Sequence, residues 1–429
     1  MQQQYSEPTP SPSHLENSSL RTPAVQRLVD IERKKALLPE QVEPFTDKYF
    51  LRTREILERE GLNPTVRAQV FVRKGPGEIG GINEALAMIE KYSSFIENGG
   101  KVFALEDGDQ FEPKETLMVF EGPLLDLVVL ETVYLGAITR ATTAANGGPE
   151  HVNLDRVRER VREIVEAAEG RPVSYFGARH WHLEEDPMIA RAAFDGGASS
   201  CSTDAGAATF GQEGIGTIPH VLENAFAALY GKDRAVVEAT KAFDRVIDPS
   251  VPRIALIDYN NREIDDSLAV AEELGSRLAG VRVDTPGENV AQGALASRNC
   301  AEVLTWEAEG LFLPQASDPY AKFWFGSGVT VTGVYALRKA LDAAGRSDVK
   351  IVLTSGFGDP EKVKAFVDAE KKLGVKLFDS LGVGGVYPSR AATMDVVGVE
   401  SSPGEFAPLS KTGRAYSPNP RLELVLGDS

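Results

Sequence analysis

The spacing of apolar positions changes along the chain and divides it into regions of different structure. Residues 45–61 and 82–100 carry apolar side chains at helical spacing, whereas residues 65–74 alternate apolar and polar positions. Alternation of this kind is typical of a strand with one face buried. Residues 45–125 are therefore predicted to form a mixed, mainly antiparallel α+β domain.

From residue 173 onward, short apolar runs end in polar residues and are followed by helix-like segments. The runs expected to be strands are 173–176, 196–202, 253–258, 279–284, 322–329, 350–356 and 377–385. Repetition of strand, polar loop and helix over roughly 200 residues indicates a parallel β/α barrel. The apolar run 127–145 is interpreted as a long helix between the domains.

We therefore predict an α/β fold, an irregular parallel β/α barrel with a smaller α+β N-terminal domain joined by C-terminal strands. The expected divisions are a disordered or extended tail (1–43), the N-terminal domain (44–140), the barrel (141–394) and a returning C-terminal segment (395–429). The tail is assigned because its start is rich in Gln, Ser and Pro. Late strand-like runs, VVGVE and RLELVL, are expected to pair with the first domain.

Composition narrows the range of functions. The formal net charge of −17 argues against nucleic acid or an anionic membrane as partner, although a local basic pocket can still hold a phosphate. The two cysteines, Cys201 and Cys300, form no CxxC motif, which favours a reducing cytoplasm. No apolar run has the length of a membrane span, and no signal peptide is expected.

Polar residues gather at the ends of the expected parallel strands. Because such strand ends meet at one edge, these residues are expected to lie close together. They are Arg179, His180 and His182; Asp258; Arg282 and Asp284; Thr354, Ser355 and Gly356; and Gly382, Gly384 and Gly385. His220, Thr217 and the serines of ASSCS, which include Ser202, are expected at the same rim.

Each of these residues also has a structural interpretation. Asp258 has about even odds of being a helix N-cap, and Arg282 with Asp284 alone would more often be an ion pair. A lone His220 before an apolar helix is more often a cap or a core residue. Two glycine-rich turns at consecutive strand ends, however, are typical of a site that holds a phosphate with backbone N–H groups.

The ordered motifs of the chain resemble those of one enzyme family. Over residues 44–416 the chain reads FTDKY, FGARH, GTIPH, LIDYN, GVRVDTP, TSGFGDPEKV, FDSLGVGG and LSKTGR. This series is similar to that of the nicotinate phosphoribosyltransferases, in particular their compact archaeal-like branch. That branch is basic after its DTP, whereas this chain continues GENVAQGALASRN.

The resemblance implies a role for each matching residue. His220 would be phosphorylated from ATP, and Asp258 and Asp284 would contact the ribose hydroxyls or a Mg²⁺ ion. Phe176 and Arg282 would enclose the pyridine ring, and Arg179 would hold a phosphate or the carboxylate of the base. The 5-phosphate would lie on the glycine-rich turns, namely on Ser355, Gly356, Gly384 and Gly385. Asp47 and Tyr49 would reach the site from the second subunit of a homodimer.

The function implied is transfer of phosphoribose from phosphoribosyl pyrophosphate to nicotinate, coupled to ATP hydrolysis, in NAD salvage. Mg²⁺ and ATP are the expected cofactor and co-substrate, and no metal site formed by the protein alone is predicted. A rival hypothesis is transfer to nicotinamide, which an acidic residue near the base would favour; Asp204 is the candidate. Two further hypotheses are a non-catalytic phosphate-binding paralogue and an unrelated barrel such as an aldolase, which would need a strand-end lysine that these strand ends lack.

Overall fold

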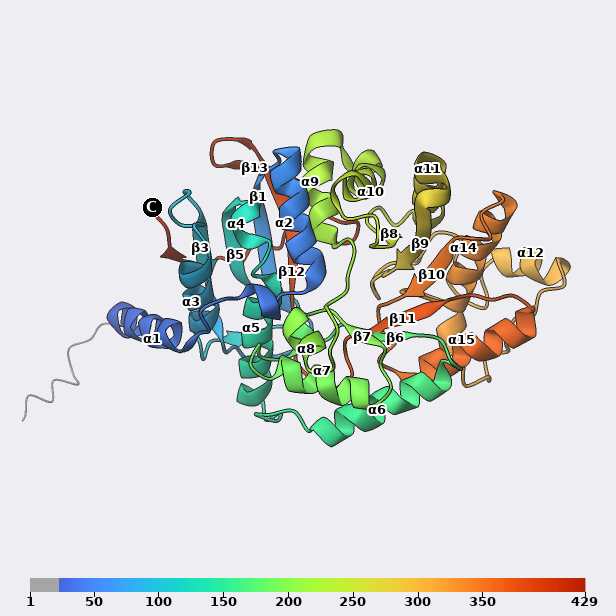
Figure 1. Cartoon of the computed structure of the whole chain (residues 1–429), viewed down its shortest axis with the longest axis horizontal. Helices are drawn as coiled ribbons and strands as arrows, with labels where there is room; N and C mark the ends of the chain where they lie inside the picture. Colours follow the sequence, from blue (N-terminus) through green and yellow to red (C-terminus); the bar gives the residue numbers. More distant parts are fainter. Residues whose placement is uncertain (1–22, 429) are drawn as a thin grey trace, which may run out of the picture.

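The computed structural model describes residues 23–428, and within them two six-stranded sheets lie side by side (Figure 1). One sheet is parallel, with strand order β7-β6-β11-β10-β9-β8. Its strands are β6 (Val173–Tyr175), β7 (Ser200–Cys201), β8 (Arg253–Leu256), β9 (Leu278–Val283), β10 (Lys350–Leu353) and β11 (Ser380–Val383). Because β7 and β8 lie at opposite ends of this order, the sheet is a curled half-barrel rather than a closed barrel.

Helices flank the parallel sheet, which explains its buried strands. They are α6 (Leu154–Ala167), α7 (Asp186–Asp195), α8 (Asp204–Ala208), α9 (His220–Tyr230), α10 (Ala235–Val246), α11 (Glu263–Leu274), α12 (Glu302–Ala308), α13 (Ala321–Trp324), α14 (Val331–Ala343) and α15 (Pro360–Leu373). In α6, Val157, Val161 and Ile164 are buried at helical spacing. The side chain of Asn153 caps this helix by accepting from the N–H of Arg156 at 3.0 Å.

The second sheet is antiparallel and has strand order β13-β12-β1-β5-β3-β14. Its strands are β1 (Thr65–Val72), β3 (Lys101–Ala104), β5 (Thr116–Pro123), β12 (Ala392–Ser402), β13 (Glu405–Pro408) and β14 (Glu423–Leu426), with β2 (Gly77–Glu78) and β4 (Gln110–Phe111) as a separate pair. Its helices are α1 (Pro23–Leu37), α2 (Lys48–Glu60), α3 (Ile82–Tyr92), α4 (Leu124–Leu127) and α5 (Glu131–Ala145). Short 3₁₀ helices are η1 (Glu43–Phe45), η2 (Ala178–His180), η3 (Lys232–Arg234) and η4 (Gly275–Arg277).

The C-terminal strands return to the N-terminal sheet, as the sequence predicts. β12 pairs antiparallel with β1 from Val66↔Val399 to Val72↔Ala392, and β14 pairs with β3. The α/β fold class is therefore confirmed, with the half-barrel as its refinement. Each sheet has its own buried apolar cluster.

Three local predictions differ from the structure. Residues 322–329 are not a strand, because Gly326 and Gly328 have φ of 96° and 80°, which an extended strand does not allow; helix α13 and a loop stand there instead. The expected tail 1–43 contains α1, which packs against α3 through the buried Ile31, while residues 1–22 lie outside the described part. The expected helix 127–145 begins only at Glu131.

Candidate active site

A cavity of about 980 Å³ opens at the carboxyl ends of the parallel strands. Loops of the half-barrel form one wall, and β12 of the antiparallel sheet forms part of the other. Among the residues predicted from sequence, its lining includes Tyr49, Phe176, Arg179, His220, Arg282, Asp284, Ser355, Gly356, Gly384 and Gly385. The parallel topology explains this convergence, because β6, β9, β10 and β11 all end at this rim.

Two turns that follow β10 and β11 expose backbone to the cavity. Ser355 and Gly356 have φ of 64° and 87°, so the first turn is left-handed at both positions. A Cβ on Gly358 would lie 2.6 Å from the carbonyl oxygen of Gly385, which shows that the two turns touch. Helix α15 begins directly after the first turn. Backbone N–H groups and a helix N-terminus together suit a phosphate.

Lys362 adds a positive charge beneath the first turn. Its Nζ donates to the carbonyl oxygen of Ser355 at 3.0 Å. Burial lowers the pKa of Lys362 to about 8, although Asp359 and Asp284 act in the opposite direction. The sequence prediction missed this residue, but its place in the first turn of the helix after TSGFGD was an available signal.

His220 is the first residue of α9 and is held by two charged neighbours. Its Nε2 lies 3.0 Å from Oδ1 of Asp258 and 2.9 Å from Nζ of Lys411, and Lys411 also forms an ion pair with Asp258. Nε2 must carry a proton to donate to Asp258 and must have a free lone pair to accept from Lys411. It therefore makes only one of these two hydrogen bonds at a time. Burial, followed by the charge of Lys411, lowers the pKa of His220, and the ring is therefore neutral at pH 7.

Arg282 and Phe176 border the cavity near the end of the strands. Nη2 of Arg282 donates to the carbonyl oxygen of Ile218 at 2.9 Å, while its buried Nε has no hydrogen-bond partner among the described residues. Phe176 is anchored by its N–H, which donates to the carbonyl oxygen of Val383 at 2.7 Å. Its ring lies beside Gly382, where a Cβ would approach within 2.6 Å. An aromatic face and an unsatisfied guanidinium suit a flat, polar ring.

Arg179 already has two partners in the cavity wall. Its Nη1 pairs with Glu131 at 3.1 Å, and its Nη2 donates to the hydroxyl of Tyr49 at 2.5 Å. Burial raises the pKa of Glu131 to about 8, although Arg179 lowers it. Glu131 was not predicted, because it lies inside an apolar helical run whose sequence shows no other chemical signal.

Asp284 is the carboxylate that follows β9 and lines the cavity. Its Oδ1 accepts from the hydroxyl of Thr354 at 2.8 Å, which fixes the side chain beside the first turn. No cluster of three or more His, Cys, Asp or Glu side chains that could hold a metal is found among residues 23–428. One carboxylate beside a phosphate site nevertheless fits Mg²⁺, which usually binds through one or two carboxylates together with substrate phosphates.

Several predicted site residues have structural contacts instead. Asp258 is 0% exposed and contacts His220 and Lys411, so its predicted contact with ribose is not what the geometry shows. Thr217 donates to the carbonyl oxygen of Ile254 at 3.0 Å, and Ser202 is buried outside the cavity lining. Neither residue belongs to the cavity lining.

The structure places Asp47 and Tyr49 differently, because Asp47 is buried outside the cavity lining and Tyr49 belongs to it. Tyr49 lines the cavity of its own chain, and its hydroxyl lies 3.2 Å from the buried carboxylate of Asp47. The first turn of α2 is brought there by the bridge between Asp47 and Thr203. Tyr49 thus contacts the cavity within one chain, and the prediction that Asp47 and Tyr49 act from a partner subunit stays a prediction.

Comparison with known proteins agrees with this architecture. Residues 47–142 match the family model described as quinolinate phosphoribosyl transferase, N-terminal domain. The nicotinate phosphoribosyltransferase pncB2 of Mycobacterium tuberculosis (strain ATCC 25618 / H37Rv) is 27% identical over 189 residues, which are 43% of this chain and 36% of the relative. The match thus spans about a third of that protein's length.

Solved structures extend the likeness in fold to most of the chain. A nicotinate phosphoribosyltransferase from Porphyromonas gingivalis has a TM-score of 0.58 and 13% identity, covering 89% of this chain and 97% of its own. One from Vibrio cholerae has a TM-score of 0.53 and 13% identity, covering 86% and 87%. At this identity they show the fold alone.

The half-barrel and the N-terminal sheet together form the fold that the solved nicotinate phosphoribosyltransferase from Porphyromonas gingivalis also has. Part of the chain is thus similar in sequence, and most of it in fold, to proteins named nicotinate phosphoribosyltransferase. No helix in residues 23–428 combines the length and the apolar character that crossing a bilayer requires.

Proposed function

We propose that this protein transfers phosphoribose from phosphoribosyl pyrophosphate to nicotinate and that ATP hydrolysis drives the transfer. The observation that carries the proposal is one cavity that combines the two glycine turns, Asp284, the unsatisfied Arg282 and the neutral His220. These are the groups needed for a sugar phosphate, a developing positive charge, a flat base and a phosphoryl acceptor.

The transfer step requires little covalent help from the protein. The bond from C1 of the ribose to the pyrophosphate oxygen breaks, pyrophosphate leaves with the electron pair, and the ring nitrogen of nicotinate bonds to C1. Asp284 lies at the cavity edge of β9, where its charge would stabilise the positive ribose in the transition state. Bound Mg²⁺, held by Asp284 and the substrate phosphates, would offset the negative charge of the leaving pyrophosphate.

ATP coupling would use His220 as nucleophile. A ring nitrogen attacks the γ-phosphorus, the bond to the bridging oxygen breaks, and ADP leaves with that electron pair. The lowered pKa of His220 keeps a lone pair available near neutral pH. Asp258 and Lys411 orient the ring, and water later releases the phosphate.

Nicotinamide is the second candidate base, and Glu131 is the reason. Asp204 is paired with Lys48 at 2.7 Å and lies outside the cavity lining, so it is not the acidic residue to consider. Glu131 lines the cavity and occupies one side of Arg179, so fewer of the guanidinium donors face a carboxylate on the base.

A homodimer located in the cytoplasm is also part of the proposal. Light scattering tests the dimer, and cell fractionation tests the location.

An assay with phosphoribosyl pyrophosphate, Mg²⁺ and either base, with and without ATP, tests the function. We expect nicotinate to be used and ATP to stimulate its use. His220→Ala should lose the stimulation but keep slow basal transfer, whereas Asp284→Asn should lower kcat roughly 100-fold in both conditions.

The variants should unfold at temperatures close to that of the wild type. Full ATP stimulation in His220→Ala would refute the role of the histidine. Absence of transfer to either base by the folded wild-type protein would refute the function itself.

A further inference from the structure

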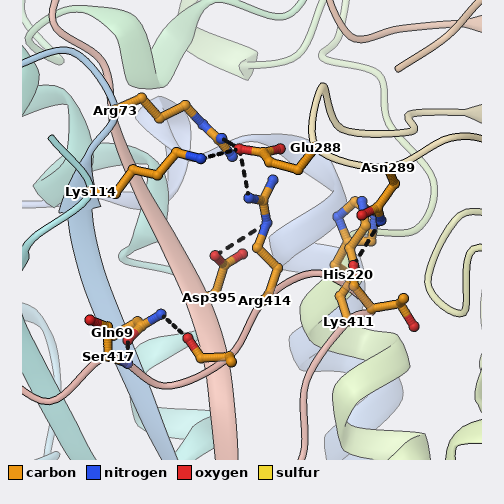
Figure 2. A network of polar contacts seen from close by, with 12 residues as sticks. Gln69, Arg73, Lys114, His220, Glu288, Asn289, Asp395, Lys411, Arg414 and Ser417 are labelled. Atoms are coloured by element: carbon orange, nitrogen blue, oxygen red, sulfur yellow. Dashed lines mark hydrogen bonds and ion pairs between the residues drawn. The ribbon is translucent and has the colours of Figure 1, made fainter. Parts of the chain in front are cut away.

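Three cationic side chains from distant parts of the chain meet at the mouth of the cavity, and Figure 2 shows all three pointing toward Glu288. Arg73 follows β1, Lys114 precedes β5, and Arg414 belongs to the C-terminal segment. Together they are named the cation cluster. All three contact the same oxygen, Oε1 of Glu288, with Lys114 Nζ at 3.0 Å, Arg414 Nη1 at 3.4 Å and Arg73 as a third ion pair.

The charge balance of this cluster is incomplete. One carboxylate faces three cations, and it is held in a charged state because Lys114, Arg73 and Arg414 outweigh burial and lower its pKa to about 2. Asp395 lies behind Arg414, with its Oδ2 3.4 Å from Nε, so that even with this second carboxylate three cations face two anions. The cluster therefore retains affinity for a more highly charged anion than a single carboxylate.

The contacts of Glu288 can be exchanged. Its side chain is 27% exposed, and those of Arg73 and Lys114 are 34% and 54% exposed. Ion pairs at such positions are individually weak and are screened by salt. Glu288 contacts all three cations through a single oxygen. A diphosphate has several oxygens and can offer each of these donors its own acceptor.

The segment that carries Glu288 also contacts the segment that contains Lys411, the residue that contacts His220. Nδ2 of the neighbouring Asn289 donates to the carbonyl oxygen of Thr412 at 2.9 Å, and Thr412 lies between Lys411 and Arg414. Lys411 contacts His220, while Arg414 contacts Glu288 (Figure 2). One short turn thus links the phosphoryl acceptor to the cation cluster.

We propose that Glu288 is an internal competitor that occupies the cation cluster until a diphosphate group displaces it. This inference rests on the proposed function, because it concerns how the same cavity admits its phosphorylated substrate. Glu288 lies in the stretch GEN, directly after GVRVDTP. Because Glu288 occupies the cation cluster, it lowers the apparent affinity for an incoming anion. It also selects polyphosphates over singly charged anions.

Calorimetric titration with inorganic pyrophosphate, without base or nucleotide, tests the inference separately from catalysis. Glu288→Gln should bind pyrophosphate at least about threefold more tightly than the wild type, because the competing carboxylate is gone. The gain should shrink when Arg414→Gln is added, since the two residues act on the same anion. The gain for acetate should be smaller than for pyrophosphate.

Glu121→Gln is the matched control. Glu121 lies on β5 outside the cavity lining, is 21% exposed and pairs with Arg67 of β1. This change therefore removes a negative charge at an exposure similar to that of Glu288. It should leave the affinity for pyrophosphate unchanged. Thermal unfolding confirms that each variant is folded.

Equal or weaker binding by folded Glu288→Gln would overturn the inference, as would a gain of the same size in Glu121→Gln or in the presence of Arg414→Gln. If the wild type transfers phosphoribose but the affinities do not differ, only the competitor role fails. If pyrophosphate binding changes as expected but neither base is used, the proposed function fails and the anion site stands.

Discussion

At the scale of single residues, the chemistry depends on which charges surround each group. Asp258 illustrates this, because a strand-end carboxylate was expected at the ribose but is completely buried against His220 and Lys411. The sequence places the residue at the correct end of β8 but contains nothing that orients its side chain. That orientation depends on Lys411, which comes from the other end of the chain.

The pH dependence of ATP stimulation should report on this arrangement. In Lys411→Met, the neighbour that lowers the pKa of His220 is gone, while Asp258, which raises it, remains. The pKa of His220 therefore rises, and the ring becomes protonated at a higher pH as the solution is acidified. The acid limb of the ATP-stimulated rate should move to higher pH, which a pH–rate profile measures.

Lys411→Arg serves as the control because it keeps the positive charge, and its profile should stay near that of the wild type. An unshifted acid limb in Lys411→Met, together with an unshifted histidine titration by NMR, would contradict this account.

Residues missed by sequence reasoning have a common cause. Glu131 and Lys362 lie in helices whose patterns report burial and helical spacing but not the direction of a polar side chain toward a cavity. Tyr49 was assigned to a partner because the resemblance supplied that role, whereas the fold of α2 brings it to the site in the same chain. Such assignments require the packing between elements.

At the scale of elements, the strand–loop–helix rhythm predicted the parallel sheet because each strand ends where a polar turn begins. The same rhythm did not reveal that the barrel stays open. Closure would require β7 to pair with β8, and these two strands do not pair. The rhythm also mistook the apolar run 322–329 for a strand, since the periodicity of so short a run does not separate strand from helix and loop. The two glycine-rich turns after β10 and β11, by contrast, were visible in the sequence.

Contact between these turns predicts different effects of two glycine substitutions. In Gly358→Ala the new Cβ would lie 2.6 Å from the carbonyl oxygen of Gly385, whereas in Gly385→Ala it would meet only Cε1 of His180 at 4.0 Å. Gly358→Ala should lower the free energy of unfolding by about 1–3 kcal/mol through overpacking. Gly385→Ala should change it by less than about 1 kcal/mol.

Denaturant unfolding of both variants measures this difference in the free energy of unfolding. In Gly358→Ala the KM for the phosphorylated donor should also rise, because the turn is displaced. Equal stability of the two variants would show that the turns are free to move apart.

At the scale of the whole molecule, one chain supplies both walls of the cavity. An acidic protein with a formal net charge of −17 gathers Arg179, Arg282, Lys411 and the cation cluster at this place. The overall charge predicted no such concentration, because composition does not record where charges lie. The position of the site followed instead from the parallel topology.

A site built within one chain predicts that inactive variants do not complement each other. Tyr49→Ala and His220→Ala, co-expressed with different tags and purified through both tags, should show no more ATP stimulation than the two variants measured alone. If Tyr49 acted across subunits, each mixed dimer would regain one intact site. Stimulation near half of the wild-type level would therefore contradict the single-chain site, and co-expressed wild type with His220→Ala calibrates that level.

The pairing of β12 with β1 has a consequence for biosynthesis. Residues 65–72 leave the ribosome long before residues 392–402, so the growing polypeptide exposes one edge of β1 while the entire half-barrel is translated. The nascent N-terminal sheet is therefore open to wrong partners until translation is nearly complete, and it is the last strands made that close it.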